Sequence, residues 1–404
     1  MVYLEKKYLL MTEKYKSVVI EGLNWAEKNK YCGYSKFDAL NSPMLEFISK
    51  NSRLIRGAFI YLNSRMPINI RPILLVKKYQ NPKGLALFIR SYFNLYNLSG
   101  DKIYFKKAIE LIDILLSISQ VKYFSGHCWG YDHPWQNKAF FAKRYYPNTV
   151  VTVFVCEALL DAYNETKDKE YLKIIKSVCK FISDDLHTII NNDKYLCSSY
   201  IPNNDYKVIN VNGLIGSLFS RIFKVTNDRK YYNNAKKYIN WVISTQTDYG
   251  AWYYTEPPHK SPITHDNYHT GFILDSIYEY MDNTNDQKFL NQYKFGLEYY
   301  KNNLFTKKFA PKWMYDKKYP HDIHGVAQGI ITFSKASKYN DSYINLAENI
   351  ARWGIKNLYN DNGRFFYQKG KYITKNFTLM RWCQAWMSFA LSSYLYKIHK
   401  KNNN

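Results

Sequence analysis

Apolar positions along this chain fall into helix-length stretches that come in pairs. In each pair an apolar stretch is followed by a short polar turn, an Asp, and a second stretch whose apolar residues recur every three or four positions. After Asp168, for example, this spacing joins Tyr171, Ile174, Ile175, Val178 and Ile182, with lysines between them. Such a stripe predicts an amphipathic helix with one packed face and one face in water.

The Asp-led stretch occurs five times, beginning at Asp101, Asp168, Asp228, Asp286 and Asp341. Subtraction of these positions gives spacings of 67, 60, 58 and 55 residues. The spacing exceeds the roughly 34 to 47 residues of two-helix solenoid repeats, and it fits a helical hairpin with one long loop. Each Asp is expected to be an N-cap, whose carboxylate accepts a hydrogen bond from a backbone N–H of the second helix.

The first helix of each pair is expected to lie inside because it is apolar on more of its faces. These inner helices are predicted at 84–98, 150–163, 213–223, 271–280 and 325–337. A sixth inner helix, 381–398, has no partner after it, but an amphipathic stretch at 15–28 offers one. The chain is therefore predicted to be all-α, with six hairpins in a closed toroid whose last hairpin is completed by the N-terminal helix. An open array with a capping helix is the alternative.

Residues 40–80 do not follow the repeat. Pro43, Pro67 and Pro72 interrupt this segment, which predicts an irregular inserted arm that packs on the ring. A membrane-surface or partner-binding element is the alternative. The whole chain, 1–404, is expected to be a single domain because no Pro/Gly/Ser-rich linker divides it, although its length alone would suggest more than one domain.

The formal net charge of +24 and the six cysteines bear on partners and location. The lysines are dispersed over the predicted outer helices, which is typical of a solvated surface, and the alternative is attraction to an anionic partner or a membrane face. No nucleic-acid partner is expected because no recognition motif or basic helix is present. The cysteines form no Cys-x-x-Cys pair and the first residues lack a signal-peptide pattern, so a reduced, cytoplasmic protein is predicted.

The loops before the inner helices hold most of the residues suited to chemistry. The best candidates for acid–base catalysis there are Asp132, Asp266, His269 and Asp322. Aromatic faces that stack on sugar rings and polar groups that bind hydroxyls or carboxylates accompany them. These candidate substrate-binding residues are His127, Trp129, Tyr131, His133, Gln136, Asn148, Tyr200, Asn212, Trp252, Tyr253, Asn267, His324, Arg381, Trp382 and Gln384.

Several reactions stay open at this point. A glycosidase would use two of the carboxylates, whereas a lyase or epimerase would abstract a proton with a His or Tyr base while Asn or Arg binds a uronate carboxylate. For Asp266 and Asp322, a role as helix N-caps is the structural alternative.

Neither a metal nor a cofactor is expected. His127, Cys128, His324 and Cys383 could form a zinc site only by meeting across the ring, and their local spacings carry no zinc signature. The chain also contains no Gly-rich phosphate loop, no Gly-x-Ser-x-Gly and no dinucleotide-binding fingerprint.

The paired helices and several motifs carry a resemblance to known proteins. The chain resembles the six-hairpin, (α/α)6-toroid glycosidase-like superfamily, which includes unsaturated glucuronyl hydrolases, N-acylglucosamine epimerases and polysaccharide lyases. More specifically, it is similar to an uncharacterised group found with prokaryotic polysaccharide-biosynthesis genes. The motifs are Trp129-Gly-Tyr-Asp-His-Pro-Trp-Gln136, Pro147-Asn-Thr-Val-Val-Thr-Val-Phe154, Asp266-Asn-Tyr-His-Thr-Gly-Phe272 and Gln384-Ala-Trp386.

Three hypotheses follow from the residues and the resemblance together. The leading one is a hydrolase, lyase or epimerase acting on an oligo- or polysaccharide, expected to contain uronic acid, in surface-polysaccharide metabolism. The second is a non-catalytic toroid that binds or scaffolds glycans. The third is a toroid enzyme acting on a lipid or a peptide.

Overall fold

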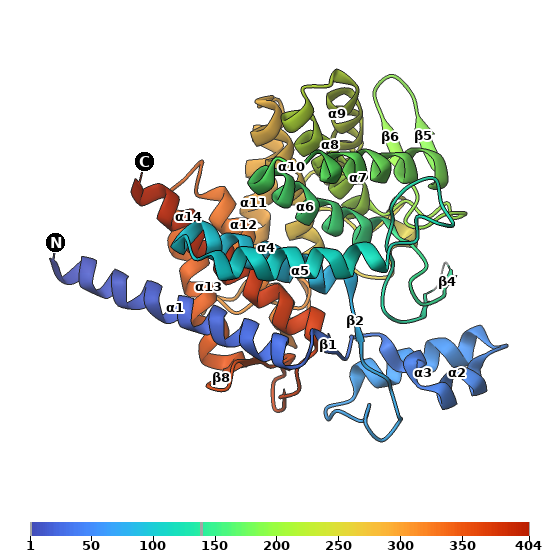
Figure 1. The fold of residues 1–404 in the computed structure, drawn as a ribbon, viewed down its shortest axis with the longest axis horizontal. Coiled ribbons are helices and arrows are strands. Elements are labelled where there is room, and N and C mark those ends of the chain that lie inside the picture. The colour runs from blue at the N-terminus through green and yellow to red at the C-terminus, as the bar shows by residue number, and fades with distance from the viewer. Residues whose placement is uncertain (1, 138–139, 404) are drawn as a thin grey trace. The chain divides into compact units, whose positions relative to one another are not determined.

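The computed structural model describes residues 2–137 and 140–403. They are mainly helical, and the strands are only two to four residues long (Figure 1). The α-helices are α1 (Val2–Lys28), α2 (Pro43–Ser49), α3 (Arg53–Arg65), α4 (Pro82–Ser99), α5 (Lys102–Ser117), α6 (Thr149–Thr166), α7 (Lys169–Lys180), α8 (Ile209–Thr226), α9 (Arg229–Ser244), α10 (Asn267–Thr284), α11 (Leu290–Asn303), α12 (Ile323–Ala336), α13 (Ser342–Leu358) and α14 (Trp386–Asn403).

The chain divides into two compact units. Unit 1 comprises residues 1–114, 132–136 and 320–404, and unit 2 comprises residues 115–131 and 137–319. Among the residues whose placement is described, no helix has both the length and the apolar character needed to cross a membrane.

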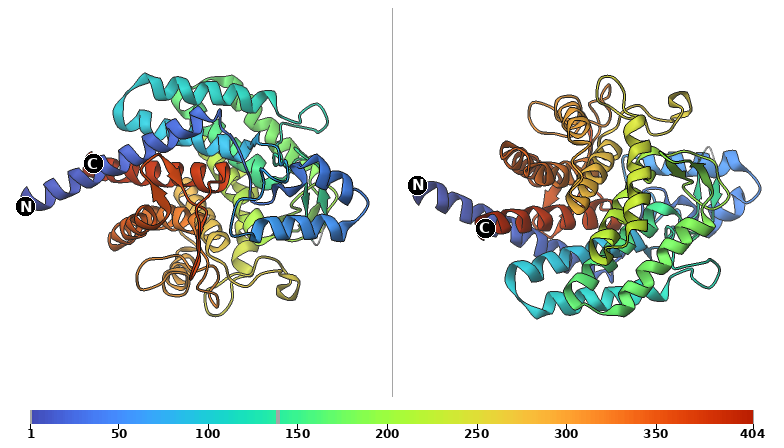
Figure 2. Two further views of the ribbon diagram at one scale, coloured as in Figure 1. Left: turned by 90° about the horizontal axis from the view of Figure 1, so that it is seen from below. Right: turned by 90° about the horizontal axis from the view of Figure 1, so that it is seen from above.

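Unit 1 contains three helical hairpins. Helix α12 packs against α13 and α14, and α14 also packs against α4 and α1. The rings of Phe93 and Phe105 join α4 to α5, and those of Tyr15 and Tyr394 join α1 to α14. The first and last helices therefore lie side by side (Figures 1 and 2), and the prediction that the N-terminal helix completes the last hairpin is confirmed.

Unit 2 contains three further hairpins, formed by α6 with α7, α8 with α9, and α10 with α11. The inner helices α6, α8 and α10 pack in sequence order, since α8 contacts both α6 and α10. Their residues are buried over most of their length, as the apolar stretches predict. The partner helices α7 and α9 bury only the stripe defined by residues such as Ile175, Val178, Ile239 and Val242.

The turn inside a hairpin has a repeated backbone conformation. Helices α4, α6, α8 and α10 each end at a residue with positive φ, namely Gly100, Lys167, Asn227 and Asn285. A left-handed residue reverses the chain directly after the last helical turn. It allows the second helix to start within a few residues, which explains the short polar turns of the sequence.

The Asp residues that follow these turns cap the second helices at three of the five positions. Asp101, Asp168 and Asp228 accept hydrogen bonds from the backbone N–H groups two residues later. Asp286 accepts from Lys288, but α11 begins only at Leu290. At Asp341 the prediction is wrong, because its side chain makes no cap bond and lies 2.8 Å from Nζ of Lys401 instead.

Short strands support the loops. In unit 1, β1 (Cys32–Gly33) pairs with β2 (Tyr79–Gln80), β8 (Tyr359–Asn360) with β9 (Arg364–Phe365), and β10 (Gln368–Lys369) with both β7 (His321–Asp322) and β11 (Thr374–Lys375), all antiparallel. In unit 2, β5 (Thr188–Asn191) pairs with β6 (Leu196–Ser198). Two further strands are β3 (Trp135–Gln136) and β4 (Phe141–Ala142). The pairing of Asp322 with Gln368 places one candidate catalytic residue on a fixed strand.

The segment 40–80 is more regular than the sequence suggested. It forms the two helices α2 and α3 after a 3-10 turn, η1 (Asp38–Asn41), in place of irregular pieces. Pro43 does not break a helix, because it occupies the first turn of α2, where its missing N–H costs nothing. Ala39, Leu40, Leu45 and Ile60 form a small core for this segment.

Candidate functional site

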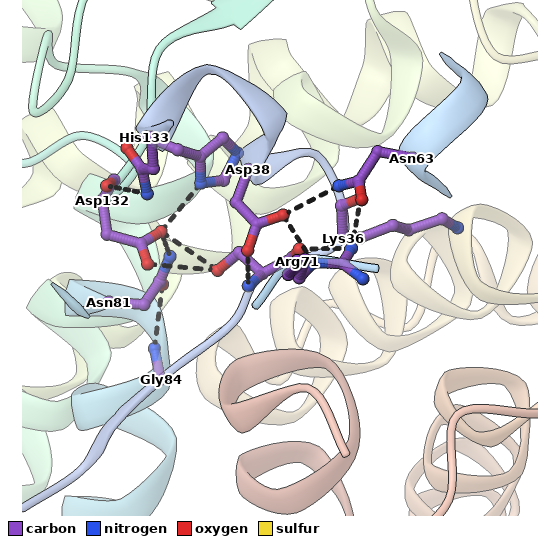
Figure 3. Close-up of polar contacts among 10 residues, drawn as sticks. Lys36, Asp38, Asn63, Arg71, Asn81, Gly84, Asp132 and His133 are labelled. Atoms are coloured by element: carbon purple, nitrogen blue, oxygen red, sulfur yellow. Dashed lines mark hydrogen bonds and ion pairs between the residues drawn. The ribbon is translucent and has the colours of Figure 1, made fainter. Parts of the chain in front are cut away.

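Asp132 is at the centre of a buried hydrogen-bond network in unit 1 (Figure 3). Its carboxylate lies 2.5 Å from Nδ2 of Asn81, 2.8 Å from Nδ1 of His133 and 3.1 Å from Oγ of Ser35. Asn81 is held in place because its other amide atom, Oδ1, caps α4 by accepting from the N–H of Gly84. The side chains that surround Asp132 therefore come from three distant parts of the chain.

The electrostatic setting keeps Asp132 ionised. Burial by itself raises the pKa of a carboxyl group, but the hydrogen bonds from His133 and Asn81 and the charges of His133 and Arg381 outweigh it, so the pKa of Asp132 is lowered. A carboxylate held in this way is a fixed negative charge and a poor proton donor. This setting suits a residue that orients His133 better than one that protonates a leaving group.

A second buried ion pair adjoins the first network. Asp38 lies 2.7 Å from Nε of Arg71, and it also accepts hydrogen bonds from Nδ2 of Asn63 and the N–H of Ser35. Ser35 thus contacts both carboxylates, since its hydroxyl lies against Asp132. Figure 3 shows the two networks side by side.

Three basic side chains of unit 1 lie against a group of aromatic rings. Nζ of Lys36 is 4.0 Å from the centre of the Trp382 ring, and the guanidinium of Arg381 is 5.2 Å from the same ring. Nζ of Lys83 is 5.0 Å from the Trp386 ring. Lys36, Lys83 and Arg381, together with Trp382, Trp386 and His324, are called the basic–aromatic cluster below.

His324 joins the two tryptophans of this cluster. Its ring centre is 4.6 Å from that of Trp382 and 4.4 Å from that of Trp386. The rings and cations thus follow one another without a break from Lys36 to Lys83. All six side chains are buried, and the three cations lie over the electron-rich faces of the tryptophan rings.

Asp322 holds part of this cluster in place. Its carboxylate accepts hydrogen bonds from Nε1 of Trp382, Nε2 of Gln368 and the backbone N–H of His324. The last bond makes it the N-cap of α12, which is the structural alternative that the sequence left open. These three donors hold the Trp382 indole and the start of α12 in place.

Buried charged side chains of both signs occur in unit 1. Among its described residues, four fully basic side chains are buried (Lys36, Arg71, Lys83, Arg381) against three carboxylates (Asp38, Asp132, Asp322), an excess of one positive charge. Buried charges are normally paired. The Arg71 guanidinium pairs with Asp38, and the other three basic groups lie over aromatic rings.

In unit 2, Asp266 and His269 form a pair at the start of α10. Nδ1 of His269 lies 3.0 Å from Oδ1 of Asp266, and the His269 side chain is 19% exposed. Asp266 occupies the N-cap position but makes no side-chain cap bond, unlike Asp322. Oδ1 of Asp266 thus contacts the imidazole, while its buried Oδ2 has no hydrogen-bond partner among the described residues.

This pairing favours one tautomer of the His269 ring. A carboxylate that accepts from Nδ1 holds the proton on that nitrogen, so Nε2 carries the lone pair of the neutral ring. The rings of Tyr254 and Tyr268 lie 4.7 and 4.4 Å from the imidazole and confine it. Burial raises the pKa of Tyr254, which keeps its phenol neutral. The arrangement can accept a proton at Nε2 and hold the resulting imidazolium against Asp266.

His265 in the same loop has a different environment. Its Nδ1 lies 2.8 Å from the carbonyl oxygen of Trp252 and its Nε2 lies 3.0 Å from the hydroxyl of Tyr249. Burial lowers the pKa of His265, and the Tyr253 ring packs 4.5 Å away. Both nitrogens are thus engaged, and this histidine positions the loop.

Other candidate residues of unit 2 have their polar atoms engaged within the protein. Asn148 caps α6 through the N–H of Val151, and Asn267 donates to the carbonyl of Leu304. Asn212 bonds the backbone of Ser198 through both its amide atoms. Such bonds give these amides a role in loop structure, while their role as substrate ligands stays a prediction.

The aromatic and histidine candidates of unit 2 also make hydrogen bonds within the protein. The indole N–H groups of Trp129 and Trp252 donate to the carbonyls of Leu115 and Val242, so both rings are anchored. Nδ1 of His127 lies 3.0 Å from Oγ of Ser177. The hydroxyls of Tyr131 and Tyr200 are 3.1 Å apart, and Tyr131 is half-buried. These residues line or support loops, and a sugar-stacking role for them is still a prediction.

Two glutamines of unit 1 complete the set. Gln136 accepts a hydrogen bond from Nε of Arg56. Gln384 donates to the carbonyls of Gly22 and Gly363 and accepts from the N–H of Phe365. Gln384 therefore joins α1 to the loop before α14.

Within the described part of the chain, no group of three or more His, Cys, Asp or Glu side chains is arranged to hold a metal ion. Burial raises the pKa of both Cys128 and Cys383. The Cys383 sulfur also accepts a hydrogen bond from the N–H of Leu379. These thiols are in an environment that opposes the thiolate form a zinc site needs.

Comparison with solved structures decides the fold. A cellobiose 2-epimerase from Bacillus thermoamylovorans matches with a TM-score of 0.63 at 11% identity, over 80% of this chain and 88% of that one. An α-mannanase from Bacteroides thetaiotaomicron matches with 0.62 at 15% identity, over 80% and 88%. An unsaturated glucuronyl hydrolase specific for heparin matches with 0.59 at 15% identity, over 80% and 89%. The chain has the (α/α)6-toroid fold.

At these identities the likeness concerns the fold alone. The sequence matches no protein-family model and no curated protein sequence at a significant level. The toroid prediction made from the hairpin repeat is confirmed, and the chemistry has to be argued from the side chains of this chain.

Several residues that matter in the toroid were missed from the sequence. Lys36 and Lys83 are buried, whereas a lysine in an unfamiliar sequence is expected on the surface. Ser35 and Asn81 reach Asp132 only through long-range packing. The Asp266–His269 pair was visible as a spacing of three residues at a helix start, where side chains at i and i+3 meet.

Proposed function

We propose that this protein is a carbohydrate-active enzyme in which His269 transfers a proton and Asp266 orients it. The observation that carries the proposal is the 3.0 Å contact between Asp266 and Nδ1 of a partly exposed His269. The same fold occurs in proteins named as an epimerase, a mannanase and a glucuronyl hydrolase, whose names all refer to sugars. That likeness supports a sugar as the substrate of this chain.

Proton abstraction from a sugar carbon is the reaction that this pair favours. His269 would accept the proton at Nε2 from a carbon next to a carbonyl or carboxylate group, while Asp266 stabilises the imidazolium. Return of a proton to the other face gives epimerisation, and departure of a leaving group with its electron pair gives elimination. Hydrolysis is less favoured, because a glycosidase needs two available carboxylates, and Asp132 and Asp322 each accept several hydrogen bonds from fixed donors.

An anionic glycan, such as one containing uronic acid, is the proposed substrate class. Unit 1 by itself supports this class, because its basic–aromatic cluster places Lys36, Lys83 and Arg381 beside tryptophan rings. A setting in surface-polysaccharide metabolism is supported by the sequence motifs around Trp129 and Asp266. A reducing, cytoplasmic location agrees with six free thiols among the described residues.

The test is hydrogen exchange in heavy water. The protein is incubated in D2O with a panel of uronate-containing and neutral oligosaccharides, and deuterium at sugar carbons is measured by mass spectrometry and NMR. Exchange reports proton abstraction even when no net product accumulates. We expect exchange with a uronate-containing sugar, and a fall of about 100-fold or more in His269→Gln, the scale of general-base catalysis.

Asp266→Asn and a matched control make the test specific. Asp266→Asn is expected to reduce exchange less than His269→Gln, because the base remains but loses its orienting charge. His187→Gln removes another His–Asp pair of unit 2, which is exposed and bonded to Asp205, and should leave exchange unchanged. Glycan binding without exchange or product formation in wild type would favour a non-catalytic, glycan-binding toroid.

The anionic preference is tested separately by calorimetry. Lys83→Met is expected to weaken binding of a uronate oligosaccharide about 10-fold or more, which corresponds to ~1.4 kcal/mol, and to change binding of a neutral one little. Lys173→Met, at an exposed pair with Glu170, is the control. Equal losses for charged and neutral sugars would show that the cluster does not select for charge.

A further inference from the structure

The segment 43–78 of unit 1 exposes an unusual number of large apolar side chains. It is called the apolar arm below. Of the twenty large hydrophobic residues that are exposed among the described residues, ten lie in these 36 positions. They are Met44, Phe47, Ile48, Leu54, Ile55, Tyr61, Leu62, Ile68, Ile73 and Leu75.

Helix α2 turns its apolar stripe outward. Met44, Phe47 and Ile48 follow i, i+3, i+4 spacing and share one face of the helix, and Phe47 is 81% exposed. The buried positions of α2 are Leu45 and Ser49 on the other side. This is the reverse of an ordinary surface helix, in which the apolar stripe faces the core.

Helix α3 does the same. Leu54, Tyr61 and Leu62 are exposed at i, i+7, i+8 spacing, and Leu54 is 83% exposed, whereas Ile60 and Asn63 point into the unit. Figures 1 and 2 show α2 and α3 apart from α13 and α14 of the same unit. The hairpin helices of unit 1 therefore do not cover these stripes.

The loop after α3 adds a third apolar element. Ile68, Ile73 and Leu75 are exposed there, and Leu75 has a φ of 53°, in the left-handed region that a Leu rarely adopts. The loop is nevertheless fixed, because Arg71 within it forms the buried pair with Asp38. The exposed apolar side chains thus belong to an ordered segment, which has its own small core of Ala39, Leu40, Leu45 and Ile60.

The net charge of the apolar arm indicates which kind of partner it would bind. Apart from Arg71, the arm has six basic residues and one acidic residue, Glu46, a difference of five positive charges. The basic residues are Lys50, Arg53, Arg56, Arg65, Lys77 and Lys78. Exposed aromatic and aliphatic side chains with lysines and arginines around them are the composition that binds anionic lipid surfaces.

We propose that the apolar arm docks on the surface of an anionic membrane. Phe47, Leu54 and their neighbours would enter the boundary between headgroups and acyl chains, while the arm's lysines and arginines bind lipid phosphates. A second copy of this chain fits the face less well, because two such faces would bring like charges together. The proposal does not depend on the proposed enzymatic function.

The test is co-sedimentation of the full-length protein with vesicles. Vesicles of equal parts phosphatidylglycerol and phosphatidylcholine are compared with vesicles of phosphatidylcholine alone, at low and high salt. Wild type is expected to bind the anionic vesicles and to be released by salt. Phe47→Ser with Leu54→Ser is expected to lower the partition coefficient at least 10-fold, since two large apolar groups lose their burial.

A matched control uses exposed apolar residues outside the arm. Tyr372 and Ile373 of the same unit are also exposed, and Tyr372→Ser with Ile373→Ser should bind vesicles like wild type. Lys50→Gln with Arg53→Gln should weaken binding only to the anionic vesicles. All these side chains are exposed, so circular dichroism should show folded variants.

Three results would overturn the proposal. One is failure of wild type to bind anionic vesicles, and another is equal binding by the arm and control variants. The third is a wild-type dimer, seen by light scattering, that becomes a monomer in Phe47→Ser/Leu54→Ser while vesicle binding is absent. That result would assign the face to self-association.

Discussion

Nε of Arg71 lies 2.7 Å from Oδ1 of Asp38, and both side chains are only 1% exposed. The pair joins the loop after α3 to the turn before α2, and Asp38 contacts Ser35, which in turn contacts Asp132. One ion pair thus supports both the apolar arm and the Asp132 network. Loss of this ion pair is therefore expected to lower the stability of the folded protein.

Arg71→Met is expected to lower the free energy of unfolding by about 3–5 kcal/mol, because it leaves a buried carboxylate without its counter-charge. Urea denaturation measures the change. Asp38→Asn combined with Arg71→Met should recover part of the loss, since it removes the orphaned charge. Lys301→Met, at an exposed pair with Glu298, is the control and should change stability little. A similar effect of Lys301→Met and Arg71→Met would contradict this account.

The hydrogen bonds of Gln384 within the protein lead to a second prediction. Its amide bonds the carbonyls of Gly22 and Gly363 inside unit 1, so Gln384→Met should cost about 1–3 kcal/mol per carbonyl left unsatisfied. Thermal unfolding would show the loss. Glycan affinity of the remaining folded protein should be unchanged if Gln384 serves the fold, whereas the substrate-binding role predicted from the sequence requires affinity to fall.

Two glycines should respond in opposite ways to replacement by alanine. A Cβ on Gly130 would lie 2.0 Å from the carbonyl oxygen of Tyr146, so Gly130→Ala must shift backbone and should cost about 1–3 kcal/mol or more. A Cβ on Gly57, within α3, meets nothing within 4 Å. Gly57→Ala should therefore stabilise the protein by ~0.5–1 kcal/mol through helix propensity. Denaturation midpoints of the two variants, each compared with wild type, measure these changes. Equal shifts would show that the close approach at Gly130 is absent.

Stability should depend on pH through His265. Burial lowers the pKa of this imidazole in the folded state, so at mildly acid pH the unfolded chain binds a proton that the folded protein does not. Stability should therefore fall as the pH drops below the usual histidine value of about 6.5. In His265→Gln this part of the pH dependence should disappear. An unchanged slope of unfolding free energy between wild type and variant would mean that His265 does not contribute.

The hairpins were predictable because their signal is local. The helical period of apolar residues and the Asp at the helix starts repeat five times, and three of these Asp residues are caps as expected. Asp341 fails as a cap because its backbone is already helical, and Oδ1 of Asn340 accepts the hydrogen bond from the N–H of Ser342 in its place. The number and order of hairpins were unaffected by this error.

The candidate sites were only partly predictable, for a related reason. Asp266 and His269 are three residues apart, so their contact follows from helix geometry. Lys36 and Trp382 are separated by most of the chain, and nothing in either segment reveals that a lysine is buried on that indole ring. Likewise, α3 was missed because prolines on both sides of it were interpreted as breaks throughout the segment.

Unit 1 is assembled from segments that are far apart in the sequence, and this affects how the chain folds during synthesis. This unit takes its first part from residues 1–114, five residues from 132–136, and its last part from 320–404. Helix α1 must wait for α14, its packing partner, until residues 386–403 have been synthesised, whereas the three hairpins of unit 2 are synthesised consecutively. Contacts between such distant segments form slowly. The apolar face of α1 therefore lacks this cover on the nascent chain until α14 has been synthesised.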